Sequence, residues 1–338
     1  MENIFTYPKR LIYWGVECGR VWLRNKAREK MELLERHQNA VAENARAAYE
    51  STRQLPNTPA PSLNKTISKP QFSQGVGNIN NGDLLVDIGV DNNGNSVIIP
   101  INKCPHLLIA GTTGSGKSVA VHSIIFQLIK KYGAGELGLL LADPKGAEFP
   151  FFYKNAPQLL KPVAVEPNDV IGILEFAISE MDRRNAILQD SGCRNIERYN
   201  QKNPQNKIKR GVIVIDEFAD LILQTDGYFE TLVKRLAAKS RSAGIHLILC
   251  TQRPDAKIVT GAIKANIPSI ICLKVASAIN SRIVLDRAGG ELLRGKGHMI
   301  CRIDGGADVE CQAHYLSDDT LERLAEQLAV AKRGAARA

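Results

Sequence analysis

The stretch PHLLIAGTTGSGKSVAVHSII, residues 105–125, decides the fold. Its centre, residues 111–118, matches the pattern G-x-x-x-x-G-K-[ST] of phosphate-binding loops. The apolar run HLLIA before it has the composition of a buried strand, and the apolar positions of residues 119–131 recur with the period of a helix. A strand, a glycine-rich loop and a helix in this order predict a nucleotide site at the start of the helix.

The residue types in this loop each suit a role in holding ATP. Glycines let backbone N–H groups wrap around phosphates at the positive end of the helix. Lys117 is expected to reach the terminal phosphates, and Ser118 to offer its hydroxyl to Mg²⁺. The predicted ATP contacts are Gly111, Thr112, Thr113, Gly114, Ser115, Gly116, Lys117, Ser118 and Val119. The competing interpretation is a glycine-rich turn that binds nothing.

A second motif, VIVIDE at residues 212–217, is an apolar strand that ends in two carboxylates. Nucleotide hydrolases place the acid that holds Mg²⁺ and the acid that orients the attacking water at such a strand end. We assign Asp216 to the metal and Glu217 to the water. Two acids after a strand are also common on protein surfaces, but together with the phosphate loop they predict an ATPase that uses ATP and Mg²⁺.

Two further polar positions are candidates for the reaction. Gln252 follows the apolar strand HLILCT and is a candidate sensor of the γ-phosphate, with a hydrogen-bonding turn residue as the alternative. Arg241, in KSRSAG just before that strand, lies at a predicted helix end. From there it can point into the nucleotide site of a neighbouring subunit, where an arginine stabilises transition-state charge, or it can be an ordinary solvated arginine.

Apolar strands alternate with amphipathic stretches from residue 104 onward, which predicts the α/β class with a mostly parallel sheet covered by helices on both faces. Two short strands, residues 84–89 and 97–100, are expected to form a hairpin around the turn-prone DNNGN segment. A final helix is expected over residues 320–332. The predicted parts are an arm with a long helix (1–54), a flexible linker (55–83), the nucleotide domain (84–316) and a C-terminal helix with a basic tail (317–338).

The N-terminal part has a composition of its own. Residues 20–53 lack Gly and Pro and carry a weak heptad pattern, which predicts one long helix that either self-associates, packs on the nucleotide domain or stands in solvent. Trp14 and Trp22 lie among basic residues, so this arm either rests on anionic lipid or binds a partner protein. Residues 55–82 are rich in Pro, Ser, Asn and Gly, as linkers are.

The composition limits the kinds of partner, site and cellular location that fit this chain. The 338 residues carry 44 Lys and Arg against 35 Asp and Glu, and this net charge of +9 permits a polyanionic partner but also fits a solvated basic surface. Seven cysteines without a C-x-x-C pair, and six scattered histidines, favour neither a disulfide framework nor a zinc site. The apolar run at residues 11–23 is too short for a spanning helix and is not a signal peptide. We expect a cytoplasmic protein, with a peripheral place at the inner face of the membrane as an option.

The amino-acid sequence of these motifs resembles that of the motor domain of the FtsK/SpoIIIE family of DNA-pumping ATPases. The segments 105–125, 211–221, 239–254, 260–268 and 281–299 carry the resemblance. It implies a RecA-like P-loop motor that assembles as a ring, commonly a hexamer, with double-stranded DNA in the central pore. It also implies that Arg241 is an arginine finger acting in trans, and that Arg253, Lys264 and Arg282 contact the DNA backbone from the pore. Backbone contacts suit a motor that must move over any sequence.

The chain also departs from the pattern of that family. Ala278 stands where a basic residue is usual, and His298 where an acidic one is usual. We expect neither the spanning helices, nor the extra domain, nor the winged-helix module of cell-division members. The sequence therefore suggests an accessory translocase of a mobile element, plasmid or phage, without sequence-directed polarity.

Three functions remain in competition. The first is an ATP-driven translocase of double-stranded DNA. The second is a coupling or secretion ATPase that moves a protein or a protein–DNA complex, with the N-terminal arm bound to a membrane channel or a recruiting protein. The third is a ring that uses nucleotide only for assembly, against which Glu217 and Gln252 argue, because a scaffold does not need hydrolytic residues.

Overall fold

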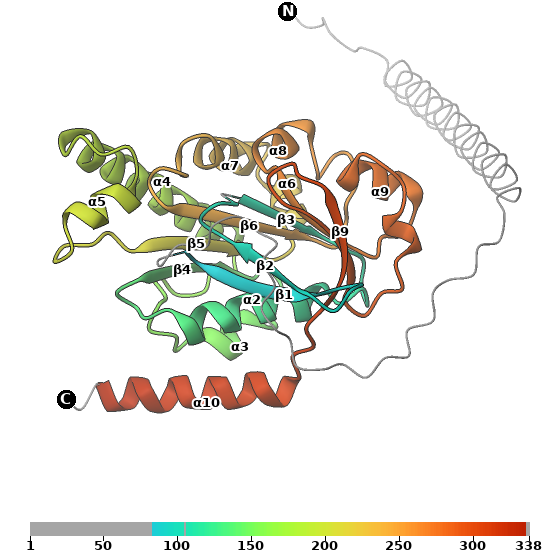
Figure 1. Cartoon of the computed structure of the whole chain (residues 1–338), viewed down its shortest axis with the longest axis horizontal. Coiled ribbons are helices and arrows are strands. Elements are labelled where there is room, and N and C mark those ends of the chain that lie inside the picture. The colour runs from blue at the N-terminus through green and yellow to red at the C-terminus, as the bar shows by residue number, and fades with distance from the viewer. Residues whose placement is uncertain (1–82, 105, 336–338) are drawn as a thin grey trace, which may run out of the picture. The chain divides into compact units, whose positions relative to one another are not determined.

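A computed structural model describes residues 83–104 and 106–335 (Figure 1). The predicted N-terminal arm, its long helix, Trp14 and Trp22, and nearly all of the predicted linker lie outside the described residues. The described part contains one nine-stranded sheet in the order β2-β1-β9-β8-β7-β3-β6-β5-β4. The domain boundaries predicted from the sequence stay predictions.

The strands divide the sheet into two halves of different construction. Neighbouring strands from β7 through β3, β6 and β5 to β4 run parallel, and those from β7 through β8, β9 and β1 to β2 run antiparallel. The strands are β1 (Leu85–Asp91), β2 (Ser96–Pro100), β3 (His106–Ala110), β4 (Leu137–Ala142), β5 (Arg210–Ile215), β6 (Ile245–Thr251), β7 (Ser269–Leu273), β8 (His298–Arg302) and β9 (Asp308–Ala313). The α/β class is confirmed, and the sheet is parallel in the half that carries the predicted nucleotide motifs.

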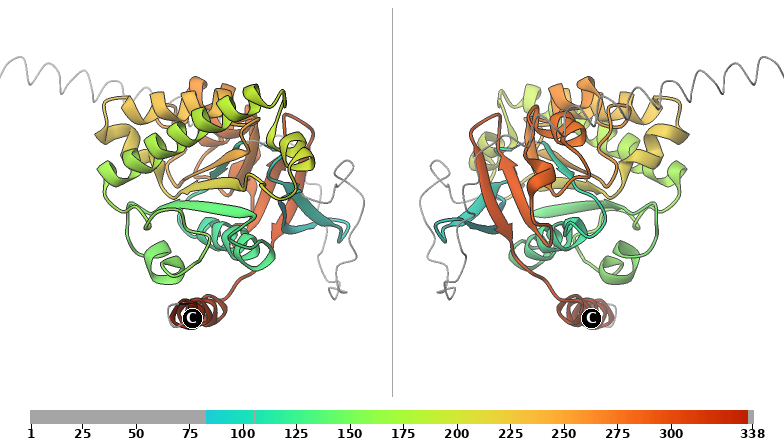
Figure 2. Two further views of the ribbon diagram at one scale, coloured as in Figure 1. Left: turned by 90° about the vertical axis from the view of Figure 1, so that its left-hand side faces the viewer. Right: turned by 90° about the vertical axis from the view of Figure 1, so that its right-hand side faces the viewer.

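Helices cover both faces of the sheet, as the sequence predicts (Figure 2). The helices are α2 (Lys117–Lys131), α3 (Phe149–Tyr153), α4 (Pro167–Asp190), α5 (Ile196–Lys202), α6 (Phe218–Gln224), α7 (Tyr228–Lys239), α8 (Gly261–Asn266), α9 (Ala278–Leu285) and α10 (Asp318–Ala335), with a 3₁₀ turn η2 (Gly290–Leu292). Helices α2, α3 and α10 share one apolar cluster with the sheet, and α4, α6, α7 and α8 share the cluster on the opposite face.

Alternate residues of the central strands pack into these two clusters. In β3, Leu107 and Ile109 join the cluster with α2, whereas Leu108 joins the cluster with α4 and α7. All five residues of β3 and all seven of β6 are buried. Strands that are apolar on both faces require a layer of helices on each side, which explains why these strands read as continuous apolar runs.

The antiparallel half begins with the predicted hairpin, since β1 pairs with β2 around a turn at residues 92–95. Gly89 interrupts the register with a bulge, and its φ is +157°. A Cβ built there would lie 2.1 Å from the Gln312 carbonyl oxygen of β9, so only glycine allows this close approach.

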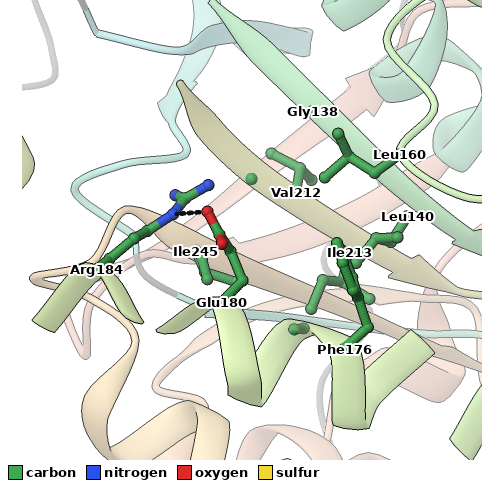
Figure 3. Close-up of a pocket in the computed structure, with 11 residues that line it drawn as sticks. Gly138, Leu140, Leu160, Phe176, Glu180, Arg184, Val212, Ile213 and Ile245 are labelled. Atoms are coloured by element: carbon green, nitrogen blue, oxygen red, sulfur yellow. Dashed lines mark hydrogen bonds and ion pairs between the residues drawn. The ribbon is translucent and has the colours of Figure 1, made fainter. Parts of the chain in front are cut away.

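A small cavity lies beneath α4, between that helix and strands β4 to β6 (Figure 3). Its volume of about 10 Å³ is at the lower limit for a single water molecule. At its rim, buried Arg184 donates to Glu180 (2.8 Å) and to the Ala243 carbonyl oxygen (2.9 Å). This cavity is a packing defect rather than a ligand site, and its arginine anchors the turn between α7 and β6.

Candidate nucleotide-binding site

The phosphate loop joins β3 to α2 and is fastened on three sides. Its Gly111 N–H donates to the Thr251 carbonyl oxygen of β6 (3.1 Å), and its Thr112 N–H to the Lys274 carbonyl oxygen after β7 (2.9 Å). On the third side the Gly297 N–H donates to the Ser115 carbonyl oxygen (2.7 Å). The loop is therefore held open by backbone contacts before any ligand arrives, which lowers the entropic cost of binding.

Glycine is required where this loop turns into the helix. Gly116 has φ of +96°, and a Cβ there would lie 2.4 Å from the Gly297 backbone nitrogen. Helix α2 begins directly after Gly116, with no acidic residue in its first turn and Lys130 and Lys131 in its last. The first turn of α2 thus carries no acidic side chain of its own, which favours an anion at its N–H groups.

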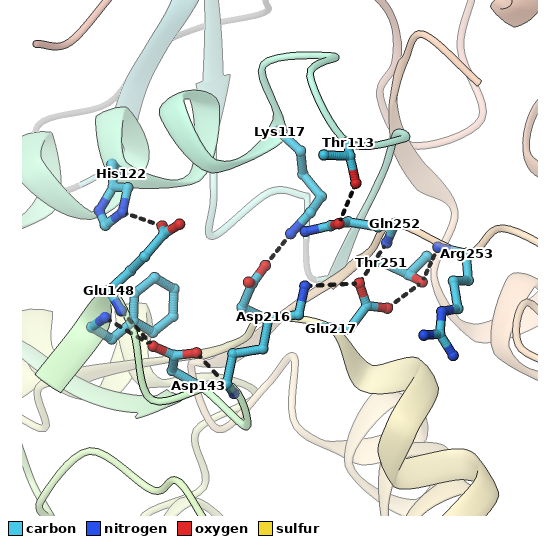
Figure 4. A network of polar contacts seen from close by, with 12 residues as sticks. Thr113, Lys117, His122, Asp143, Glu148, Asp216, Glu217, Thr251, Gln252 and Arg253 are labelled. Atoms are coloured by element: carbon cyan, nitrogen blue, oxygen red, sulfur yellow. Dashed lines mark hydrogen bonds and ion pairs between the residues drawn. The ribbon is translucent and has the colours of Figure 1, made fainter. Parts of the chain in front are cut away.

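Lys117 and Asp216 meet at the bottom of the loop. Lys117, the first residue of α2, is 3% exposed and forms an ion pair with the Asp216 carboxylate, which follows β5 (Figure 4). Burial by itself lowers the pKa of the Lys117 ammonium, but the Cys250 sulfur, Asp216 and Glu217 outweigh burial and raise the pKa above its ordinary value. The ammonium therefore stays charged, and its present partner is the residue predicted to hold the metal.

Glu217 faces the end of β6 and not Lys117 (Figure 4). Its Oε1 accepts from the Thr251 hydroxyl (2.9 Å) and its Oε2 from the Gln252 N–H (3.0 Å). The Lys145 ammonium lies 3.8 Å from Oε2. The backbone of Glu217 is left-handed, with φ of 54°, a conformation that is unfavourable for a residue with a Cβ. Adjacent acids in the sequence thus have different partners in the structure.

Gln252 connects this carboxylate to the phosphate loop. While its N–H binds Glu217, its side-chain Oε1 accepts from the Thr113 hydroxyl (2.9 Å). Thr113 is exposed at the tip of the loop. The predicted sensor therefore touches both the loop and the predicted base, which is the geometry that a response to a bound phosphate needs.

Asp143 shapes a turn beside the site, and the sequence analysis did not assign it a role. This buried carboxylate ends β4 and accepts from the N–H groups of Lys145, Gly146, Glu148 and Phe149. The segment LADPKGAEF carries the signal, because an aspartate followed by Pro and Gly after a buried strand favours a turn closed by the aspartate side chain. The turn places the Lys145 ammonium near Glu217.

Glu148 lies at the same turn, near the predicted metal ligand. Its Oε2 is 2.6 Å from His122 Nε2, and the other ring nitrogen, Nδ1, is 2.7 Å from the Tyr153 hydroxyl. The hydrogen bond with His122 lowers the pKa of Glu148, and the Ser118 hydroxyl contributes in the same direction. An ionised carboxylate thus stands beside the Ser118 hydroxyl, although no pattern in the sequence pointed to it.

Arg241 lies at the opposite ends of the strands from these residues. It precedes β6, whereas Gln252 follows it, and the six residue steps of that strand span about 20 Å. Arg241 is exposed and lines a surface hollow of about 510 Å³ together with Lys103, Arg194 and Lys239. The structure therefore does not bring Arg241 to the nucleotide site of its own chain.

The three residues predicted to contact DNA lie after β6, on α8 and on α9. Arg253 follows β6 with its side chain 65% exposed, and its nearest acidic partner is Asp220 at 3.6 Å. Lys264 on α8 pairs with Asp286 at the end of α9 (2.5 Å), the helix that also carries exposed Arg282. Arg253 and Arg282 are thus exposed to a ligand, whereas the side chain of Lys264 is largely covered and lies against Asp286.

The two positions that depart from the family pattern have ordinary local roles. Ala278 begins α9, after the cap residue Ser277. His298 begins β8, where its Nδ1 accepts from the Arg294 N–H (3.1 Å) and its Nε2 lies 2.7 Å from Glu310 Oε1. The histidine therefore bridges two neighbouring segments in the antiparallel half of the sheet.

The comparison with known proteins agrees with this geometry. Residues 76–256, which include the phosphate loop and both carboxylates, match the FtsK/SpoIIIE family. The chain belongs to the FtsK/SpoIIIE family. DNA translocase FtsK of Caldanaerobacter subterraneus subsp. tengcongensis is 42% identical over 243 residues, or 72% of this chain and 34% of that protein. DNA translocase SftA of Bacillus subtilis is 40% identical over 246 residues, or 71% of this chain and 26% of that protein. The chain spans about a third of the length of the first of these relatives.

Solved structures of P-loop ATPases share the fold. The pCW3 conjugation coupling protein TcpA, in its monomer form with ATPγS, is 32% identical, has a TM-score of 0.65, and is matched over 74% of this chain and 71% of that one. The type VII secretion ATPase EccC of Thermomonospora curvata has a TM-score of 0.64 at 23% identity over 73% of this chain and 31% of that one, which supports the fold alone.

The oxygen atoms near the loop suit Mg²⁺. Mg²⁺ in nucleotide sites is held by one or two protein oxygens together with phosphates and water, and Asp216 and Ser118 supply oxygens of this kind. Residues 83–104 and 106–335 contain no cluster of three or more His, Cys, Asp or Glu side chains that could hold a metal alone. In the same residues, no helix has the length and the apolar character needed to span a bilayer.

Proposed function

We propose that this protein is an ATPase that drives movement along double-stranded DNA and works as a ring, in the simplest case a hexamer. The single observation that carries the proposal is the arrangement at the end of β6, where Gln252 contacts the phosphate loop and the candidate base Glu217 within one residue of the candidate DNA contact Arg253. The names of the relatives, DNA translocase FtsK and SftA, support DNA as the substrate.

ATP would bind with its phosphates in the loop formed by residues 111–118. Lys117 would exchange its ion pair with Asp216 for the terminal phosphates, which frees Asp216 to hold Mg²⁺ together with Ser118. Bound Mg²⁺ would neutralise developing charge on the phosphates. Glu217 would take a proton from the attacking water, and Gln252 would sense the terminal phosphate through its link with Thr113.

Arg241 would complete the site of a neighbouring subunit. Its place at the opposite edge of the sheet from its own phosphate loop supports a role in trans, because a ring brings the two edges of adjacent subunits together. An arginine supplied in this way stabilises charge in the transition state. Single subunits would then bind ATP but hydrolyse it slowly.

DNA would contact Arg253, Arg282 and Lys264, the last after it leaves Asp286. The contacts would be with phosphates, so that movement would not depend on base sequence. We further propose that the protein acts for a mobile element, plasmid or phage, at a cytoplasmic location, and that the N-terminal arm, residues 1–54, meets lipid, a channel or a recruiting protein.

A coupling or secretion ATPase is the second candidate. The similarity to the conjugation coupling protein TcpA at 32% identity favours it, since that relative is matched over most of its length. Such a protein would need a channel partner and would respond to that partner rather than to naked DNA.

The deciding experiment is steady-state ATP hydrolysis with and without linear double-stranded DNA. We expect several-fold stimulation by DNA in the unaltered protein, no hydrolysis in Lys117→Ala, and loss of stimulation in the triple variant R253A/K264A/R282A. The matched control K154A/K202A/K207A removes the same charge from exposed positions elsewhere and should keep the stimulation. Hydrolysis that is robust but indifferent to DNA would reject the translocase and favour the coupling ATPase.

A further inference from the structure

The candidate base is enclosed and restrained by its contacts with the end of β6. Glu217 is 2% exposed, and both of its carboxylate oxygens already accept hydrogen bonds, from the Thr251 hydroxyl and from the Gln252 N–H. A general base must come within hydrogen-bond reach of the water that it deprotonates. With 2% exposure and one hydrogen bond to each oxygen, Glu217 is held against β6 and away from solvent, and breaking its contacts with β6 would free an oxygen to approach that water.

The Thr251 hydroxyl, unlike the Gln252 N–H, both donates a hydrogen bond to Glu217 and accepts one from Arg253. Thr251 is fully buried, and its hydroxyl has one hydrogen, which it donates to Glu217 Oε1 (2.9 Å). The same oxygen accepts from the Arg253 N–H (3.0 Å). One hydroxyl therefore joins the candidate base to the backbone of the candidate DNA contact, and a displacement of Arg253 acts directly on the group that restrains Glu217.

The connection continues to the helix with the second exposed cation. Asn280 of α9 donates from Nδ2 to the carbonyl oxygen of Pro254 (2.9 Å), the residue after Arg253. Arg282 lies two residues further along α9. Residues 253 and 254 are thus held from both ends, by Thr251 and by α9, so that a polyanion on Arg253 and Arg282 would pull on this segment.

We propose that Thr251 is a positioning residue that holds Glu217 away from water until contact with the phosphate backbone of DNA moves residues 253 and 254. Release is favoured by the left-handed backbone of Glu217, because that strained conformation persists only while surrounding contacts impose it. The inference rests on the proposed function for the identity of the polyanion. The restraint on Glu217 itself is a property of this chain with or without DNA.

The test compares T251V with T251S in the full-length protein. Valine has nearly the shape of threonine but lacks the hydroxyl, whereas serine keeps the hydroxyl and loses a methyl group. We expect T251V to hydrolyse ATP several-fold faster than the unaltered protein without DNA, and its ratio of DNA-stimulated to basal rate to fall toward one. T251S should behave as the unaltered protein, and KM for ATP should change little in either variant, because Thr251 does not touch the phosphate loop through its side chain.

Two results overturn the proposal. In the first, T251V lowers the basal and stimulated rates by the same factor, which would mean that Thr251 only places Glu217 for catalysis. In the second, T251S and T251V change the rates alike, which would assign the effect to packing. Thermal unfolding and binding of a fluorescent ATP analogue show whether each variant is folded.

A second variant keeps the proposal testable if T251V does not fold. Asn280→Ala removes the connection between α9 and Pro254 on the surface side, and we expect it to keep the basal rate and lose part of the stimulation by DNA. Unchanged stimulation in this variant would contradict the proposed path. If the unaltered protein shows no stimulation at all, the proposed function fails, whereas the restraint on Glu217 still stands or falls with the basal rate of T251V.

Discussion

Replacement of Asp216 by Asn should destabilise the protein strongly in the absence of nucleotide. Asp216 is the partner of the Lys117 ammonium, and the side chain of Lys117 is only 2% exposed, against 11% for Asp216. Removal of one member of a buried ion pair costs about 3–5 kcal/mol, because the remaining charge is left without a partner. Since Asn keeps a carbonyl oxygen and water reaches one side of the pair, we expect about 3 kcal/mol, or a decrease in Tm of about 6–12 °C.

The measurement is a double-mutant cycle by urea unfolding without ATP or Mg²⁺. Lys117→Met and Asp216→Asn should each lower the free energy of unfolding, whereas the double variant should come within about 1 kcal/mol of the unaltered protein, since removal of both charges is close to neutral. The exposed pair Arg235–Asp182, with 55% and 50% side-chain exposure, is the control, and Asp182→Asn should cost less than about 1 kcal/mol. Additive losses in the double variant would refute the reasoning, because they would show that the two charges do not compensate one another.

Three further outcomes follow from the structure. Gly116→Ala should abolish binding of ATP, measured by fluorescence titration, because its Cβ would lie 2.4 Å from the Gly297 nitrogen at φ of +96°. Asp143→Ala leaves the backbone N–H groups of Lys145, Glu148 and Phe149 without their acceptor, so we expect faster hydrogen exchange in the loop after β4 and a loss of about 2 kcal/mol on unfolding. The hydrogen bond with Asp87 raises the pKa of His314, so this pair stabilises the fold fully below pH 6.5 and loses its effect as the pH rises through the folded-state pKa. His314→Gln should therefore lower the urea midpoint more at pH 6 than at pH 8.5, and an equal loss at both values would contradict this.

The parallel half of the sheet could be predicted because each of its strands is a local signal. Burial on both faces requires a continuous apolar run, and β3, β4, β5 and β6 all have one. Helix boundaries were less accurate than the strands. The final helix begins earlier and ends later than expected, at Asp318–Ala335.

The antiparallel half depends on pairing that no local pattern reveals. Strand β9, with the sequence DVECQA, has only two buried positions and was not expected at all. It lies between β8 and β1, so its place is fixed by segments about 10 residues before it and more than 200 residues before it. Strand β8 is an apolar run, but its direction opposite to β7 could not be predicted, since an apolar run carries no information on orientation.

The site shows the same division between local and long-range information. The motifs identified Lys117 and Asp216 as neighbours in function, and the structure brings them into contact. They did not show that Glu217 turns away from that pair, because this depends on a left-handed backbone and on a hydroxyl from another strand. A threonine after an apolar strand is common, and only its two hydrogen bonds make Thr251 informative.

The end of β6 shows how one short segment can contact the phosphate loop, the candidate base and solvent at the same time. Successive residues of a strand point to opposite faces, so the side chains of Thr251 and Gln252 contact different neighbours although both residues hydrogen-bond to Glu217. Thr251 contacts the candidate base, the Gln252 side chain contacts the phosphate loop, and Arg253 emerges into solvent. Because these contacts belong to one rigid stretch of backbone, a displacement at Arg253 of a few tenths of an ångström would alter all of them together. In the proposed translocase, coupling between hydrolysis and movement would therefore need no long pathway through the core, and it would be sensitive to the backbone at residues 251–254 more than to any single side chain on the surface.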